Sequence, residues 1–246
     1  MKPLREVISV KENHEQELLK LPGVTGVAAG YKYKNGKRTD EIAVCVFVQK
    51  KRQQVPDAER IQPELDGVST DVIERTFTPR TASMKLEDAV LMVDKGKYTP
   101  LKGGISIGPC RSVGGYVFTG TLGAIVRDNV TNNPMMLSNF HVMCIDNGWS
   151  VGDDMAQPSR VDSGSCPSDV VGSLQRAALT NRVDGAIASI SGRSFHCSIV
   201  DIGDVAGTNT ATLGMAVRKR GRTTSLTYGT VDSVNLSVKV PYGDSD

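Results

Sequence analysis

The stretch Met135-Met136-Leu137-Ser138-Asn139-Phe140-His141-Val142 joins an apolar strand to small polar residues and a histidine. Such a segment predicts a rigid strand that presents one titratable side chain at its tip. Strand-like segments separated by turn signals recur on both sides of it, with the spacing of a β-sandwich or β-barrel. These segments are 120–127, 135–138, 170–177, 185–190, 212–218 and 229–240. We therefore expect a mainly β fold from about residue 103 onward.

The residues before this β-rich part predict a small α+β unit of their own. A short polar surface helix is expected over 11–20. Strands are expected over 24–34, 41–50 and 68–76. Asn35-Gly36 is typical of a two-residue type I′ hairpin turn, and the strand after it is apolar on both faces, which predicts a central position. Because residues 77–100 have the composition of a linker, we expect domains at 1–95 and 96–246.

The composition excludes several classes of function. The 246 residues carry 29 Lys and Arg against 27 Asp and Glu, a formal net charge of +2, so binding of a polyanion through bulk charge is excluded. The 25 glycines and the low aromatic content of 5% favour short strands and turns over a helical bundle. The longest apolar run, 42–48, is far shorter than the roughly 20 residues of a membrane-spanning helix. Since no signal peptide is recognisable either, we expect a cytoplasmic protein without a membrane partner.

The five cysteines favour reduced thiols. Cys45 lies in an apolar strand and is expected in the core. No CxxC pair is present, so a zinc ribbon is not expected, and neither a metal nor a cofactor is indicated. One disulfide among the remaining four cysteines stays open; these are Cys110, Cys144, Cys166 and Cys197.

Three histidines limit the candidates for acid–base chemistry. His14 is expected at the surface, and a metal site at His196 is not favoured, since its neighbour Cys197 would point to the opposite face of a strand. His141 stands at a strand tip, where a general base is needed. Asp184 precedes an apolar strand, where a carboxylate needs a partner, and a catalytic histidine needs such an acid to set its tautomer. The alternatives are a satisfied histidine at a strand end and a surface aspartate.

These segments, taken in order, resemble the trypsin-like, chymotrypsin-fold serine peptidases. The similarity is closest to a bacterial branch whose catalytic histidine lies in an L-S-N-x-H-V segment, here 137–142 after the glycine-rich strand 120–126. Val183-Asp184-Gly185-Ala186-Ile187-Ala188 matches the V-D-x-A-I-A segment that carries the catalytic aspartate. Weaker similarity extends over most of the chain: 24–27, 34–37 and 66–72 resemble the usual leader, 152–158 and 171–174 the connection, and 214–224 with 229–231 the start of the second barrel.

The resemblance implies an antiparallel double β-barrel and a serine endopeptidase that acts on polypeptides through an acyl-enzyme. It assigns His141 as the base and Asp184 as the orienting acid, and it implies a nucleophilic serine in a G-D-S-G segment. Gly243-Asp244-Ser245 has the right order, but Asp246 stands in place of the last glycine. The segment is therefore either the motif with Ser245 as nucleophile or a plain turn, in which such residues are common. About 146 residues follow the N-terminal unit, fewer than the roughly 200 that such folds often use. We therefore expect a C-terminally incomplete barrel, with the nucleophile beyond residue 246 and no activity in the chain as written.

Other interpretations stay open or are not favoured. Cys166 lies between the base and the acid, and Cys144 lies on the base's own segment, so neither is favoured as a nucleophile. A catalytically inactive pseudopeptidase or binding module on the same barrel is the alternative function. The basic run Arg218-Lys219-Arg220-Gly221-Arg222 lacks interleaved aromatic residues, which favours a solvated strand edge over a nucleic-acid site.

Overall fold

The computed structural model describes residues 2–78, 82–84 and 93–240. The secondary structure is mainly β, with 44% strand and 12% helix, as expected. The chain divides into two compact units. The N-terminal unit comprises 1–79, 209–217 and 229–246, and the barrel unit comprises 80–208 and 218–228. The domain ranges 1–95 and 96–246 stay a prediction.

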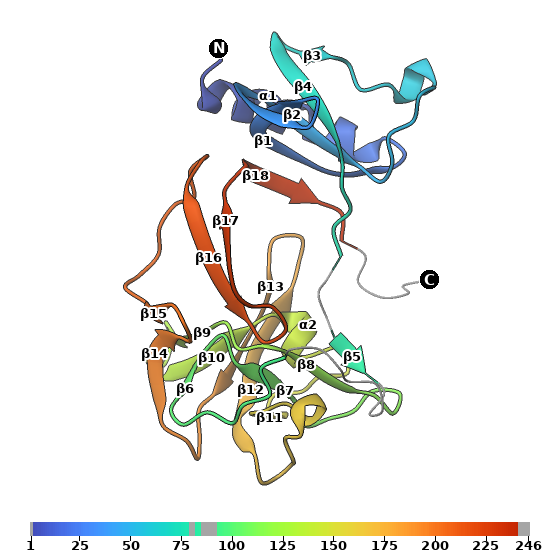
Figure 1. Ribbon diagram of the computed structural model, residues 1–246. Coiled ribbons are helices and arrows are strands. Elements are labelled where there is room, and N and C mark those ends of the chain that lie inside the picture. The colour runs from blue at the N-terminus through green and yellow to red at the C-terminus, as the bar shows by residue number, and fades with distance from the viewer. Residues whose placement is uncertain (1, 79–81, 85–92, 241–246) are drawn as a thin grey trace. The chain divides into compact units, whose positions relative to one another are not determined.

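The N-terminal unit is a five-stranded sheet with one helix, α1 (Leu4–Lys20), packed on one face (Figure 1). The strand order is β18-β1-β2-β4-β3, and only the β2–β4 pair is parallel. The elements are β1 (Val24–Lys34), β2 (Lys37–Val48), the 3-10 helix η1 (Asp57–Glu59), β3 (Glu64–Leu65), β4 (Val68–Glu74) and β18 (Ser233–Val238).

The hairpin between β1 and β2 confirms the sequence prediction. Asn35 and Gly36 both have positive φ, +52° and +74°, as a two-residue primed turn requires. β2 lies between β1 and β4, with Val44 and Val46 in the core under α1. Cys45 lies on the other face and is only 1% exposed, so its expected place in the core is also confirmed.

Helix α1 begins earlier than expected, at Leu4 instead of residue 11. Its first turns contribute Val7 and Val10 to the core of the N-terminal unit, and Leu18 joins them near the end of the helix. The helix expected over 11–20 is present, but the prediction missed its first turns, in which Val7 and Val10 pack on the sheet.

The segment predicted as one strand over 229–240 forms parts of two strands, β17 (Ser225–Thr230) and β18. β18 adds to the edge of β1, with Gly30 opposite Ser233. A Cβ atom at Gly30 would lie 2.7 Å from the Asp232 carbonyl oxygen, so only glycine allows this approach. The ammonium of Lys11, which is fully buried, donates hydrogen bonds to Asn235 and Ser237 of β18, both at 3.0 Å. The family resemblance did not indicate this pairing.

The barrel unit contains a curled, antiparallel eight-stranded sheet of order β5-β8-β7-β11-β12-β13-β10-β9 (Figure 1). Its strands are β5 (Ala82–Met84), β7 (Ser106–Pro109), β8 (Val117–Thr121), β9 (Ala124–Arg127), β10 (Pro134–Ser138), β11 (Asp154–Ala156), β12 (Val170–Leu179) and β13 (Asp184–Ser189). The smaller elements are β6 (Leu101–Gly103), α2 (Phe140–Met143), the 3-10 helix η2 (Arg160–Asp162), β14 (Phe195–Ile199), β15 (Gly203–Asp204) and β16 (Ala216–Gly221), which pairs with β17. The trypsin-like double barrel itself stays a prediction.

The core of this sheet is built from buried residues of several of its strands. Ile107, Met136, Met155 and Leu174 are all fully buried in one cluster. Short helix α2 adds buried side chains to the same cluster. The residues just after β10 are therefore anchored by burial rather than free in a loop, which matters for His141.

The structure contains a disulfide between Cys110 and Cys166, so the expectation of reduced thiols was wrong for this pair. The two cysteines lie 56 residues apart in sequence, and only the fold brings them together. Cys45 and Cys144 are buried free thiols, and Cys197 is an exposed one.

The basic run is a solvated strand edge only in part: Arg218 and Lys219 are exposed, whereas Arg220 and Arg222 are largely buried, which corrects the sequence interpretation for these two arginines. The Arg220 side chain is 6% exposed and pairs with Asp94 and Asp201. The Arg222 side chain is 3% exposed and forms a two-point ion pair with Asp162, whose side chain is fully buried. Two largely buried carboxylates, Asp94 and Asp162, and the half-exposed Asp201 supply these partners from distant parts of the sequence, so the run alone could not indicate them.

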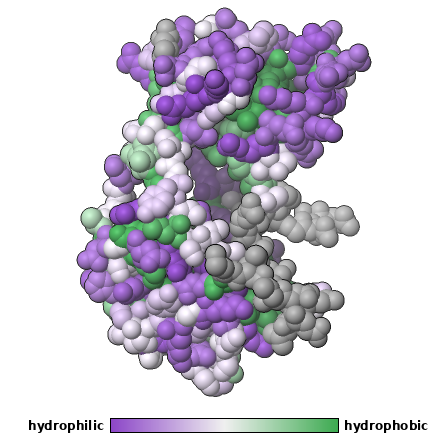
Figure 2. Space-filling model, in the orientation of Figure 1, coloured by the Kyte–Doolittle hydropathy of each residue, from purple (hydrophilic) through white to green (hydrophobic). Residues whose placement is uncertain are grey.

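The surface carries a mixture of polar and apolar side chains. Figure 2 shows mainly hydrophilic residues on the visible surface of each unit, interrupted by smaller hydrophobic areas. Within the described residues, no helix combines the length and apolar character needed to cross a bilayer.

Candidate functional site

The pairing of β10 with β13 brings the two predicted catalytic residues together. Ser138, the last residue of β10, lies opposite Ala186 of β13 in antiparallel register. His141 follows Ser138 by three residues, and Asp184 precedes Ala186 by two. Both side chains therefore come from the same end of adjacent strands, a place that rigid backbone elements define.

The His141 ring and the Asp184 carboxylate form a close pair. Nδ1 of His141 lies 2.5 Å from Oδ2 of Asp184. The backbone N–H of His141 donates to the other carboxylate oxygen, Oδ1, at 3.2 Å. The side chains are 15% and 19% exposed, so the pair is largely shielded but remains accessible from solvent.

Neighbouring apolar residues hold the turn that carries His141. Phe140 and Val142, on either side of it, are buried, and the Phe140 ring packs edge-on against Trp149 with 6.4 Å between centroids. A Cβ atom at Gly120 would lie 2.5 Å from the Val142 side chain, so glycine is required there for α2 to settle against β8. The segment that carries His141 is therefore anchored by packing on both sides of the histidine.

A further contact at this site was not anticipated. Nδ2 of Asn139 donates to the backbone carbonyl oxygen of Asp184 at 3.0 Å. Asparagine is common just before a helix, where its side chain usually caps the helix. This preference was the only feature of the sequence that pointed to Asn139. The sequence alone could not indicate that the amide contacts another strand instead.

The other candidates within the described residues do not join this pair. Ser245 lies outside the described residues. Cys166 is bound in the disulfide, and burial raises the pKa of the Cys144 thiol to about 12, so neither is a nucleophile. Nδ1 of His196 lies 3.0 Å from the Ser198 hydroxyl, in a partly exposed strand. Among the described residues, no group of three or more His, Cys, Asp or Glu side chains is placed to hold a metal ion.

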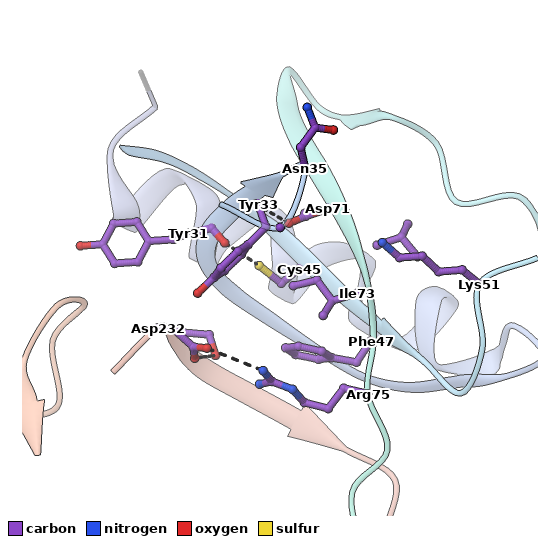
Figure 3. Close-up of a pocket in the computed structure, with 13 residues that line it drawn as sticks. Tyr31, Tyr33, Asn35, Cys45, Phe47, Lys51, Asp71, Ile73, Arg75 and Asp232 are labelled. Carbon is purple, nitrogen blue, oxygen red and sulfur yellow. Dashed lines mark hydrogen bonds and ion pairs between the residues drawn. The ribbon is translucent and has the colours of Figure 1, made fainter. Parts of the chain in front are cut away.

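An alternative feature is a cavity of about 560 Å³ in the N-terminal unit (Figure 3). Tyr33, Phe47 and Arg75 surround Cys45, whose sulfur faces the cavity in Figure 3. Burial, reinforced by the nearby Asp71 carboxylate, raises the pKa of this thiol to about 12. The cavity thus contains an inert thiol and no acid–base pair comparable to His141 and Asp184.

Comparison with known proteins adds no assignment. No family model matches the chain, and no curated protein matches it.

Proposed function

We propose that the protein is a serine endopeptidase of the trypsin-like type, with His141 as the general base and Asp184 as its orienting acid. One observation supports this most strongly: the 2.5 Å contact between Nδ1 of His141 and Oδ2 of Asp184. A carboxylate on Nδ1 holds the proton there and leaves Nε2 as the atom that accepts a proton from a nucleophile.

In the proposed reaction, the hydroxyl of a serine attacks the peptide carbonyl carbon while its proton passes to Nε2 of His141. The tetrahedral intermediate then collapses, and the same proton passes to the leaving amine as the C–N bond breaks. A water molecule then attacks the acyl-enzyme through the same two steps and releases the acid product. Asp184 stabilises the imidazolium in both steps and stays ionised.

The serine is proposed to lie outside the described residues. Ser245 is the candidate within the 246 residues, and a serine that follows residue 246 is the other. Fluorophosphonate probes distinguish the two, because they label only a serine activated by a working base. We expect the 246-residue chain to remain unlabelled; labelling that disappears in Ser245→Ala would assign the nucleophile to Ser245.

The function is tested on the protein expressed from its complete gene. We expect covalent fluorophosphonate labelling that is lost in His141→Ala and kept in the matched control His196→Ala. If folded protein is never labelled, or if His141→Ala is labelled like the wild type, the peptidase proposal fails. The first of these results would favour the alternative, a non-catalytic binding module.

A further inference from the structure

Asn139 occupies an unusual place at the start of helix α2. Its backbone is extended, with φ −79° and ψ 154°, as expected for the residue before a helix, but its side chain makes no capping hydrogen bond. The amide instead reaches the adjacent strand and donates to the Asp184 carbonyl oxygen at 3.0 Å. This contact leaves the first turn of α2 to be capped by another group.

Asp184 provides that cap. Its Oδ1 accepts the backbone N–H of His141, the second residue of α2, which is a usual target of a capping side chain. Its Oδ2 meets Nδ1 of the same histidine. Two hydrogen bonds thus run from His141 to the Asp184 carboxylate, and one from Asn139 to the Asp184 backbone, so the two segments are connected by a closed ring of contacts.

The ring has a geometric consequence. The Asp184 carboxylate can contact both the backbone N–H and the ring nitrogen of His141 only if the Asp184 backbone is correctly placed relative to α2. The Asn139 contact is the one member of the ring that acts on the Asp184 backbone rather than on its carboxylate. Loss of that contact would let the start of β13 shift, and one of the two carboxylate contacts would lengthen.

We propose that Asn139 is a positioning residue for the His141–Asp184 pair: by holding the Asp184 backbone, it keeps the proton of the neutral imidazole on Nδ1. This inference rests on the proposed function for its importance, because the Nδ1–H tautomer is the one able to accept a proton from a nucleophile at Nε2. The tautomer itself can be measured without any activity.

The chain is well suited to that measurement because it contains three histidines, His14, His141 and His196. Labelling with ¹⁵N-histidine and recording long-range ¹H–¹⁵N correlations at mildly alkaline pH shows which ring nitrogen carries the proton. The variants His14→Gln and His196→Gln assign the signals. In the wild type we expect His141 to be mainly the Nδ1–H tautomer.

Two substitutions at Asn139 separate positioning from capping. Asn139→Ala removes both the capping group and the donor to the Asp184 carbonyl oxygen. Asn139→Asp has nearly the same shape and remains a strong capping residue, but it loses the Nδ2 donor. We expect both variants to shift the tautomer ratio of His141 toward Nε2–H by about fivefold, the size that loss of one ordinary hydrogen bond produces. Asn181→Ala, an exposed asparagine in the turn before Asp184, is the control and should leave the ratio unchanged.

Each outcome has a separate meaning. A wild-type ratio in Asn139→Asp would overturn the positioning role, and so would collapse of the His14 and His196 signals in both variants, which would indicate a general requirement for folding. If His141 in the wild type is mainly Nε2–H, the base–acid pair, and with it the proposed function, fails instead.

Discussion

Two aspartates of the barrel unit are each paired with a basic side chain, but the two pairs differ in burial and in the nature of the base. Asp162 and Arg222 are 0% and 3% exposed, whereas Asp184 and His141 are 19% and 15% exposed. Arginine keeps its charge at every accessible pH, while histidine can gain or lose a proton near neutrality. A permanent, fully enclosed pair can only support structure; a partly accessible pair with a titratable member can carry out chemistry.

The surroundings of the two pairs reinforce this difference. Asp162 Oδ2 also accepts the Ser106 hydroxyl at 2.6 Å and lies within reach of Ser159 and Thr119. Burial by itself raises the pKa of Asp162, but the hydrogen bonds from Arg222 and Ser106 outweigh it and hold this pKa below its usual range. The two oxygens of Asp184 meet the backbone N–H and the ring Nδ1 of His141.

The largest effect on stability is expected from Asp162→Ala. This change leaves the Arg222 guanidinium buried without its partner, and we expect a loss of about 3–5 kcal/mol in the free energy of unfolding, measured by urea denaturation. The double variant Asp162→Leu/Arg222→Met should recover most of this loss, because two apolar groups need no partner. If the double variant stays as unstable as Asp162→Ala, the hydrogen-bond network around Asp162 stabilises the fold beyond its pairing with the Arg222 charge.

The disulfide involves a residue near Asp162 in sequence, since Cys166 follows Asp162 by four residues. Replacing both Cys110 and Cys166 with alanine should lower the free energy of unfolding by about 2–4 kcal/mol, because the cross-link restricts the unfolded chain. Cys197→Ala, at an exposed free thiol, serves as the control. Equal stability of the double variant and the wild type would contradict a stabilising disulfide.

The pH dependence of stability should also distinguish the pairs. The folded-state pKa of Asp162 is lowered, so its contribution is complete above the unfolded pKa of about 3.9 and is lost as the pH falls through the folded value. Unfolding curves for wild type and Asp162→Asn should therefore converge as the pH is lowered below about 4. Curves that stay parallel across this range would exclude Asp162 as a source of acid sensitivity.

The smallest effect on stability is expected from Asp184→Asn. The site is partly open to solvent, and asparagine can still accept the His141 N–H, so the loss should be below about 1 kcal/mol by urea denaturation. A loss as large as that of Asp162→Ala would mean that Asp184 is mainly structural, and the contrast between the two pairs would disappear.

Local signals in the sequence account for much of this structure. Asn35-Gly36 indicated its hairpin because the turn requires positive φ at these two residues, and the apolar residues on both faces of β2 indicated a central strand. The approach of His141 and Asp184 was anticipated through the family resemblance. The residues that were missed depend on distant partners: Cys110 and Cys166 are 56 residues apart, and Arg222 and Asp162 are 60 apart. No local pattern encodes such pairs.

We propose that Asp184 sets the chemistry of His141 rather than the stability of the fold. The rate of fluorophosphonate labelling of the protein expressed from its complete gene, compared between wild type and Asp184→Asn, tests this directly. We predict that the folded variant is labelled about 10⁴-fold more slowly, because asparagine would present the wrong tautomer of His141 to the nucleophile. An unchanged labelling rate in a folded Asp184→Asn variant would contradict the claim.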